Sequence, residues 1–200
     1  MSEERLTVKF IDVENIKRKD LNGLSYVLRE DFERADGYEA EEDKVSHVVS
    51  AYLKRKYVGE WETDKNGKPY ALGKYFNISH GKGAVVFIES VSPVGIDIEK
   101  IRRADERLKR YISSDEEFAY IKDDGRFFEI WTAKESLAKA FGTGVSVRAA
   151  SIPALPVNGV KSFNGEKFFS RCVRISGYVV SITRKGDKPF DAIISEETLS

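Results

Sequence analysis

The chain has 200 residues, and its 33 Lys and Arg residues balance 33 Asp and Glu residues, so the formal net charge is zero. This balance argues against a general nucleic-acid binder, because phosphate contacts need a basic excess. The single cysteine excludes an intramolecular disulfide and a cysteine-based zinc site, which favours a cytoplasmic protein. The 12 Phe, 9 Tyr and 2 Trp residues can fill a core, so we expect a folded chain. No apolar run approaches the ~20 residues of a membrane span, and no signal peptide is apparent, so we expect no membrane association.

The first half of the chain begins with a predicted strand and continues with a predicted helix. Residues Leu6–Val13 alternate loosely, which is typical of a strand. Between Glu39 and Val58 the apolar residues recur with helical spacing. They form one stripe: Val45, Val48, Val49, Tyr52 and Leu53. His47 lies off this stripe, so we interpret it as a solvated helix residue. The segment Trp61–Gly73 is rich in turn residues.

The centre of the chain combines two predicted strands with two predicted helices. Ala84–Ser90 and Val94–Glu99 are separated by a short turn, which predicts a hairpin. Ser114-Asp115-Glu116-Glu117 has the form of a capping box and should begin a helix near Asp115. A longer helix should run from about Gly125 to Phe141 and end at Gly142.

The C-terminal part is predicted to be mainly β-structure. Asn164-Gly165 indicates a turn, Tyr178–Thr183 is the clearest strand, and the tail from Asp187 is polar and weakly patterned. Helices and strands alternate without regular βαβ spacing, so an α+β fold is favoured over a doubly wound sheet. The motif V-V-x-I occurs at Val85–Ile88 and Val179–Ile182, which hints at a duplicated half.

Two carboxylates stand two residues apart in the motif Asp97-Ile98-Glu99. In a strand they point to the same face, where they repel each other unless a cation lies between them. Oxygen-only pairs of this kind suit Mg²⁺. The alternative is an ordinary polar strand edge that faces solvent.

The predicted long helix carries charged residues on or beside its apolar stripe. Lys134 falls in the middle of the stripe, so either its stem reaches the surface or its ammonium meets an anion at the helix flank. Glu135 and Lys139 lie one turn apart at the border of the stripe. Taken alone, they would be an ordinary i,i+4 ion pair.

A third polar cluster is found within Phe76–Gly83. Ser79, His80 and Lys82 lie near two glycines, which allow backbone N–H groups to approach a phosphate. The cluster is a candidate anion cradle, and the alternative is an ordinary loop before a strand. Neither a GxGxxG motif nor a Walker-type loop is present, which disfavours the common nucleotide-binding folds.

In combination and in this order, the three clusters resemble the 4′-phosphopantetheinyl transferases of the Sfp type. The matching motifs are N-I-S-H at Asn77–His80, G-I-D-I-E at Gly95–Glu99 and W-T-A-K-E-S-L-A-K at Trp131–Lys139. Further matches are Gly67-Lys68-Pro69, the stretch Tyr111–Glu116, which is similar to the family's F-F-S-x-x-E, and the glycine turn Phe141–Gly144. The resemblance covers roughly Asp43 to Val147.

The resemblance implies an enzyme that transfers the 4′-phosphopantetheine arm of coenzyme A to a serine of an apo carrier protein and releases adenosine 3′,5′-bisphosphate. By similarity, Asp97, Glu99 and Glu135 should hold Mg²⁺. Glu135 is also the favoured acceptor of the serine proton, and Lys139, the second candidate catalytic residue, should contact the pyrophosphate.

The resemblance also suggests further residues that contact coenzyme A. Ser79 and His80 should bind other phosphate oxygens, and Lys68 should bind the nucleotide end. Lys134 would meet an anion, either a phosphate or a neighbouring carboxylate. Lys44 matches loosely a position where relatives carry a basic phosphate ligand, and as a lysine it would lack the bidentate contact of arginine.

For the fold, the resemblance implies two similar α/β halves in a pseudo-twofold arrangement. We expect one unit over residues 1–200, with approximate halves 1–93 and 94–200 and the active site between them. The expected partners are an apo acyl or peptidyl carrier protein and coenzyme A, with no nucleic acid or membrane, and we expect a monomer. The alternatives are a catalytically inactive relative that binds coenzyme A or a carrier protein, and a different Mg²⁺-dependent phosphoryl or nucleotidyl transferase. The latter would need its own phosphate loop.

Overall fold

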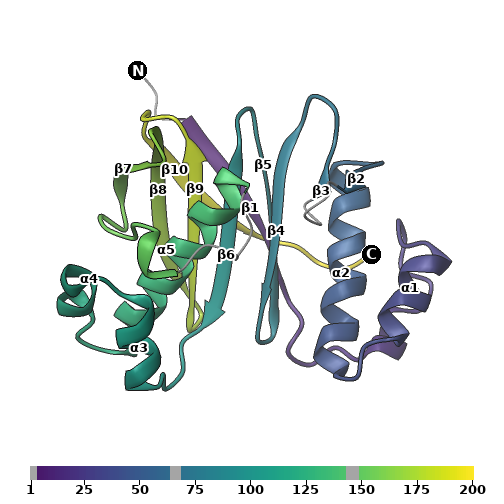
Figure 1. The fold of residues 1–200 in the computed structure, drawn as a ribbon. Coiled ribbons are helices and arrows are strands. Elements are labelled where there is room, and N and C mark those ends of the chain that lie inside the picture. The colour runs from purple at the N-terminus through teal and green to yellow at the C-terminus, as the bar shows by residue number, and fades with distance from the viewer. Residues whose placement is uncertain (1–3, 64–68, 143–148) are drawn as a thin grey trace.

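Two four-stranded sheets form the frame of the protein in a computed structural model that describes residues 4–63, 69–142 and 149–200 (Figure 1). The first sheet has the order β10 (Phe190–Glu196), β1 (Glu4–Asp12), β5 (Ala84–Ser90), β4 (Tyr75–Gly81). The second has the order β6 (Val94–Lys100), β9 (Tyr178–Lys185), β8 (Glu166–Ile175), β7 (Gly159–Phe163). All pairings are antiparallel except that of β1 with β10, which is parallel.

The edge strands β4 and β6 bring the two sheets together. The side-chain oxygen of Asn77 on β4 accepts a hydrogen bond from the backbone N–H of Ile96 on β6, at 2.9 Å. Gly81 permits a close approach at the end of β4, because a Cβ atom there would lie 2.6 Å from the carbonyl oxygen of Ile98. The strands that carry the N-I-S-H and G-I-D-I-E motifs are thus held against each other.

Each sheet is covered by one long helix (Figure 1). Helix α2 (Glu41–Tyr57) packs on β5 and α5 (Asp124–Phe141) packs on β6 and β9. The remaining short elements are α1 (Arg29–Asp36), α3 (Glu106–Ile112), α4 (Asp115–Tyr120), the 3₁₀ turns Arg18–Leu21 and Ala149–Ser151, and the small pair β2 (Glu62–Thr63) and β3 (Pro69–Tyr70). The α+β fold is confirmed, and the two V-V-x-I segments lie on the interior strands β5 and β9, one in each sheet.

The predicted helices begin and end as their sequences indicate. The predicted stripe of α2 is buried throughout, and acidic residues in its first turn and basic residues in its last complement the helix dipole. The Ser114 hydroxyl caps α4, and the Asp123 carboxylate caps α5. Gly142 ends α5 with a φ of 90°, a left-handed conformation that glycine adopts without strain.

The predicted hairpin between Ala84–Ser90 and Val94–Glu99 is wrong. Strand β5 pairs with β1 and β4, whereas β6 pairs with β9, so the turn between β5 and β6 carries the chain from one sheet to the other. Five successive residues are buried in each of these strands, Ala84–Ile88 and Val94–Ile98, because a helix covers one face of each strand and the other face packs into a core that both sheets share.

Two further segments form strands that we did not predict, because their sequences are polar. The cluster that could have been a loop is the strand β4, so Ser79 and His80 lie on a sheet edge. The weakly patterned tail contains β10, which joins the sheet of the first half. The division into halves 1–93 and 94–200 stays a prediction.

Helix α5 lies unusually close to β6, and a glycine makes this possible. A Cβ atom at Gly95 would lie 2.1 Å from the carbonyl oxygen of Ser136 and 2.5 Å from the backbone nitrogen of Ala140. Buried hydroxyl pairs complete the contact with the sheet, with Thr132 at 2.7 Å from Ser181 and Ser136 at 2.8 Å from Thr183. The C-terminal half of α5 is therefore fixed relative to the G-I-D-I-E strand.

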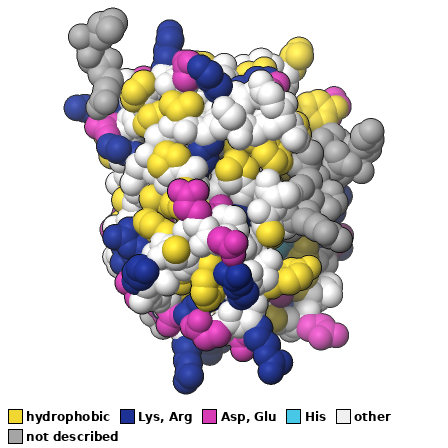
Figure 2. Space-filling model, turned by 60° about the vertical axis from the view of Figure 1, so that its left-hand side comes forward, with side chains coloured by type: hydrophobic (Ala, Val, Ile, Leu, Met, Phe, Trp, Pro, Cys, Tyr) yellow, Lys and Arg dark blue, Asp and Glu magenta, His cyan; other side chains and the backbone are white. Residues whose placement is uncertain are grey.

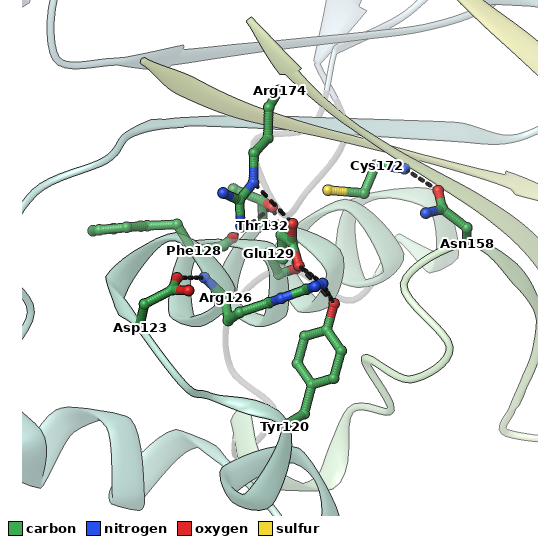
Figure 3. A network of polar contacts seen from close by, with 9 residues as sticks. All are labelled: Tyr120, Asp123, Arg126, Phe128, Glu129, Thr132, Asn158, Cys172 and Arg174. Carbon is green, nitrogen blue, oxygen red and sulfur yellow. Dashed lines mark hydrogen bonds and ion pairs between the residues drawn. The ribbon is translucent and has the colours of Figure 1, made fainter.

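A polar network holds the N-terminal half of α5 to α4 and β8 (Figure 3). The nearly buried carboxylate of Glu129 accepts hydrogen bonds from the Tyr120 hydroxyl at 2.6 Å, Arg126 at 3.0 Å and Arg174 at 2.9 Å. Burial and the hydrogen bond to Glu129 raise the pKa of Tyr120 to about 12. This network orients the helix that carries the W-T-A-K-E-S motif.

The surface reflects the even balance of charges. Figure 2 shows one face of the molecule, on which acidic and basic side chains are interspersed. Within the described residues, no helix is both long and apolar enough to cross a membrane.

Candidate functional site

A pocket of about 460 Å³ lies where α2, β4, β6 and α5 meet. Its lining residues are Tyr38, Asp43, His47, Ser50, Lys54, Pro69, Ile78, Ser79, His80, Asp97 and Lys139. The pocket thus unites one or two members of each predicted cluster: Ser79 and His80 from β4, Asp97 from β6 and Lys139 from α5.

The ammonium group of Lys139 is the centre of the contacts at the inner end of this pocket. It lies 2.7 Å from Oδ1 of Asp97 and donates to the Ser79 hydroxyl at 2.9 Å and to the carbonyl oxygen of Ile96 at 3.1 Å. The Ser79 hydroxyl in turn donates to Oδ1 of Asp97 at 2.8 Å. Asp97 is buried, and the ammonium group of Lys139 and the Ser79 hydroxyl satisfy its Oδ1 atom.

Glu135 and Glu99, the other two predicted metal ligands, lie near Asp97. Burial raises the pKa of Glu135, and the negative charges of Asp97 and Glu99 raise it further, whereas Lys139 opposes them. Glu99 also pairs with Arg102, at 2.7 Å. The three carboxylates are therefore close enough to repel each other through space.

The donor set fits Mg²⁺ in its chemistry. All three side chains offer carboxylate oxygens, which are the ligands that hard cations prefer, and a divalent cation would relieve their mutual repulsion. As placed, no three His, Cys, Asp or Glu side chains of the described residues are gathered closely enough to hold a metal ion, and Lys139 contacts one oxygen of Asp97.

His80 lines the pocket from β4 and is exposed. Desolvation lowers its pKa, and the nearby positive charge of Lys139 lowers it further, while Asp43, Asp97 and Glu42 act in the opposite direction. The imidazole is thus favoured in its neutral form at neutral pH, able to donate one hydrogen bond and accept another.

Lys134 is placed away from the pocket. Its ammonium lies 2.7 Å from the Glu117 carboxylate and donates to the carbonyl oxygen of Ile152 at 2.6 Å, and the side chain is 2% exposed. Of the two anions considered, the structure therefore shows a carboxylate. The F-F-S-x-x-E match assigns the family's glutamate to Glu116, which is exposed, whereas the partner of Lys134 is the next residue.

Lys44, another predicted ligand of coenzyme A, is not brought to the pocket. Lys44 lies next to Asp43 in the first turn of α2 but is not among the lining residues. Lys68 lies outside the described residues, as do Gly67, Thr143 and Gly144 of the supporting motifs.

The pocket also contains residues that the sequence analysis missed. Asp43, His47, Ser50 and Lys54 line it from one face of α2, and His47, which we interpreted as a solvated residue, is partly buried there. The His47 ring lies 5.5 Å from that of Tyr38, and burial lowers its pKa. The spacing of these four residues, one or two helical turns apart, forms a polar stripe that could have indicated a second wall.

Comparisons with known proteins agree with the motifs. A family model of the 4′-phosphopantetheinyl transferase superfamily matches residues 93–183. Both β6, with Asp97 and Glu99, and α5, with Glu135 and Lys139, fall inside this match. Over these residues the chain is similar to the 4′-phosphopantetheinyl transferase superfamily.

Individual proteins that match the chain are also named as 4′-phosphopantetheinyl transferases. The chain is 31% identical over 157 residues to 4′-phosphopantetheinyl transferase gsp of Aneurinibacillus migulanus, covering 69% of this chain and 66% of that protein. It is 35% identical over 103 residues to psf-1 of Bacillus pumilus, covering 47% and 44%, and 28% identical over 143 residues to Sfp of Bacillus subtilis (strain 168), covering 62% and 64%. The resemblance to the Sfp type is confirmed, and the chain spans less than two thirds of the length of these relatives.

Proposed function

We propose that the protein transfers the 4′-phosphopantetheine group of coenzyme A to a serine hydroxyl of an apo acyl or peptidyl carrier protein. The reaction breaks the pyrophosphate bond, forms a phosphodiester with the serine oxygen and releases adenosine 3′,5′-bisphosphate. The relatives named as 4′-phosphopantetheinyl transferases support this assignment.

One observation carries the proposal: Ser79, His80, Asp97 and Lys139 come from three separate motifs and line the same pocket, with Glu135 close to Asp97. Attack on a pyrophosphate requires neutralisation of its charge and acceptance of the proton from the attacking hydroxyl. A pocket that brings a lysine and an imidazole together with carboxylates offers groups for both tasks.

The chain's own residues divide these tasks. Lys139 binds and orients the pyrophosphate, and His80 and Ser79 bind other phosphate oxygens of coenzyme A. Glu135 accepts the proton of the serine hydroxyl. Asp97, Glu99 and Glu135 would hold Mg²⁺, which supplies Lewis-acid stabilisation of the phosphoryl oxygens when bound.

Transfer is tested by incubating the protein with coenzyme A, Mg²⁺ and a panel of apo carrier proteins, followed by mass measurement of each carrier. We expect the mass of one phosphopantetheine group to be added to at least one carrier. The variants Asp97→Ala and Glu135→Gln should each abolish most turnover while the far-UV circular dichroism spectrum stays unchanged. A normal rate in either variant removes that residue from the assigned role.

The same assay separates the enzyme from an inactive relative. If coenzyme A or a carrier binds but no carrier from fatty-acid, polyketide or peptide assembly is modified, the transferase assignment fails. Omission of Mg²⁺ and its replacement by Mn²⁺ then show which ion supports turnover.

A further inference from the structure

Arg102 is a cation beside the predicted metal ligands and takes no part in the proposed chemistry. It follows β6 by two residues, and its guanidinium donates to the Glu99 carboxylate at 2.7 Å and to the carbonyl oxygen of Lys100 at 3.0 Å. The same guanidinium lies over the ring of Phe128 on α5, with 4.8 Å between its central carbon and the ring centre. Contacts from two elements thus hold one positive charge against Glu99.

The ring under Arg102 is a fixed platform. Phe128 is buried in the N-terminal half of α5, and it packs edge to face against Phe127 with 5.0 Å between the ring centres. The Thr132 hydroxyl donates to the carbonyl oxygen of Phe128 at 2.7 Å (Figure 3). The position of Arg102 therefore depends on the same helix that carries Glu135.

The three predicted metal ligands differ in the cation that neutralises each of them. Asp97 has the ammonium of Lys139 at 2.7 Å, and Glu99 has the guanidinium of Arg102 at the same distance. Within the described residues, Glu135 forms no ion pair, although the charge of Lys139 reaches it. The affinity of a carboxylate site for a divalent cation rises with the negative charge of its ligands. Both resident cations therefore lower this affinity.

The contact of Arg102 is the weaker of the two. The side chain of Arg102 is 50% exposed and that of Glu99 is 21% exposed, and solvent screens such a pair. Lys139 is more buried and has two further oxygen partners, the Ser79 hydroxyl and the carbonyl oxygen of Ile96. A divalent cation carries twice the charge of Arg102 and competes for the same carboxylate, so it can displace this guanidinium.

We propose that Arg102 is a resident counter-ion of Glu99 that competes with the divalent cation and thereby sets the affinity of the three carboxylates for it. The inference rests on the proposed function, in which Asp97, Glu99 and Glu135 hold that cation. When the cation displaces Arg102, the Lys100 carbonyl and the Phe128 ring keep the guanidinium nearby, where its charge continues to oppose the ion. Arg102 is thus a positioning residue, which acts through Glu99.

Binding of Mn²⁺ alone, followed by the electron paramagnetic resonance signal of the free ion, tests this role without turnover. Arg102→Gln removes the charge and should bind Mn²⁺ about fivefold more tightly than the wild type at low ionic strength. The difference should shrink in ~1 M salt, because the guanidinium is half exposed and is screened. Arg102→Lys retains the charge and should stay within about twofold of the wild type.

The matched control is Arg103→Gln, which removes the same charge from the next residue along the chain. Arg103 is exposed and its charge acts on Asp124, so this variant should bind Mn²⁺ as the wild type does. An unchanged or weaker affinity in Arg102→Gln overturns the proposal, as does an equal gain in Arg103→Gln, which would show a general effect of net charge.

A second set of outcomes separates this inference from the proposed function. If Asp97→Ala binds Mn²⁺ as well as the wild type does, or if neither binds it, the metal site and the role of Arg102 both fail. If a carrier protein is modified while Arg102→Gln keeps the wild-type affinity for Mn²⁺, only the role of Arg102 fails. If no carrier is modified while Arg102→Gln binds Mn²⁺ more tightly, the transferase assignment fails and the counter-ion role stands.

Discussion

Glu117 on α4 is the ion-pair partner of Lys134 on α5, with 2.7 Å between carboxylate oxygen and ammonium nitrogen and both side chains at most 5% exposed. The same carboxylate accepts hydrogen bonds from the backbone N–H groups of Ser114 and Ala154. This arrangement explains how a lysine can occupy the apolar stripe of a helix: it binds three segments together through one buried anion.

Replacement of Lys134 by methionine should therefore lower stability and leave coenzyme A binding unchanged. The variant leaves the buried carboxylate of Glu117 without its cation, and the loss of one partner of a buried ion pair destabilises a protein by about 3–5 kcal/mol. Denaturant unfolding measures the change, and calorimetry on the folded variant measures coenzyme A binding. A weaker affinity for coenzyme A at unchanged stability would contradict the structural role and favour the phosphate contact suggested by the resemblance.

Gly95→Ala should disturb both stability and activity. The added methyl group would lie 2.1 Å from the carbonyl oxygen of Ser136, so α5 must move away from β6. Overpacking of this kind costs about 3 kcal/mol, and the shift separates Lys139 from Asp97. Thermal unfolding and the rate of carrier modification should both report it. A variant with normal stability would show that α5 and β6 can separate freely.

Ser79→Ala tests the hydrogen bond at the strand edge. The variant removes a buried hydroxyl that donates to Asp97 and accepts from Lys139, while Lys139 keeps its contact with Asp97. A single hydrogen bond contributes about 1 kcal/mol, so we expect KM for coenzyme A to rise roughly fivefold with little change in kcat. Ser162→Ala, at an exposed position on β7, is the matched control. A large fall in kcat alone would assign Ser79 to the chemical step.

Glu197 should make the stability of the protein depend on pH in the acidic range. Burial works to raise its pKa, but hydrogen bonds from Tyr57, Lys9 and Lys56 outweigh this effect and bring the pKa to about 2. The folded pKa lies below the unfolded value of about 4.3, so the stabilisation is complete above that value and is lost as the pH falls toward 2.

Glu197→Gln should thus cost on the order of 2 kcal/mol at neutral pH, and this difference from the wild type should shrink as the pH falls below about 4. Urea unfolding at several pH values measures it. The exposed neighbour provides the control, because Glu196→Gln should change stability by less than about 0.5 kcal/mol. A cost that does not vary with pH would show that the charge of Glu197 is not involved.

Local patterns predicted most helices and several strands. The stripe of α2, the cap at Ser114 and the stop at Gly142 are decided within one helix, so the sequence alone indicates them. The pairing of β5 and β6 depends instead on which strands lie nearby, and a short turn is compatible with either a hairpin or a crossing between sheets. The polar β4 and β10 are strands because neighbouring strands satisfy their backbone groups.

The candidate site was predictable to the extent that its residues belong to motifs. Asp97, Ser79, His80 and Lys139 were each weak signals, and only their resemblance to one family united them. The second wall, with His47 and Lys54, was not predicted because each residue resembles an ordinary exposed helix position. Glu117 was missed as the partner of Lys134 because the motif match placed the glutamate one residue earlier.

The parallel pairing of β1 with β10 has a consequence for the order of folding. Glu4 pairs with Phe190, so the chain must close a loop that contains the whole second sheet before this ladder can form. Until then β1 has one unsatisfied edge, and the sheet that carries Ser79 and His80 lacks its fourth strand. Long-range closure of this kind is slow, so the first sheet is completed late during biogenesis, after the second sheet has become available to bring β10 back.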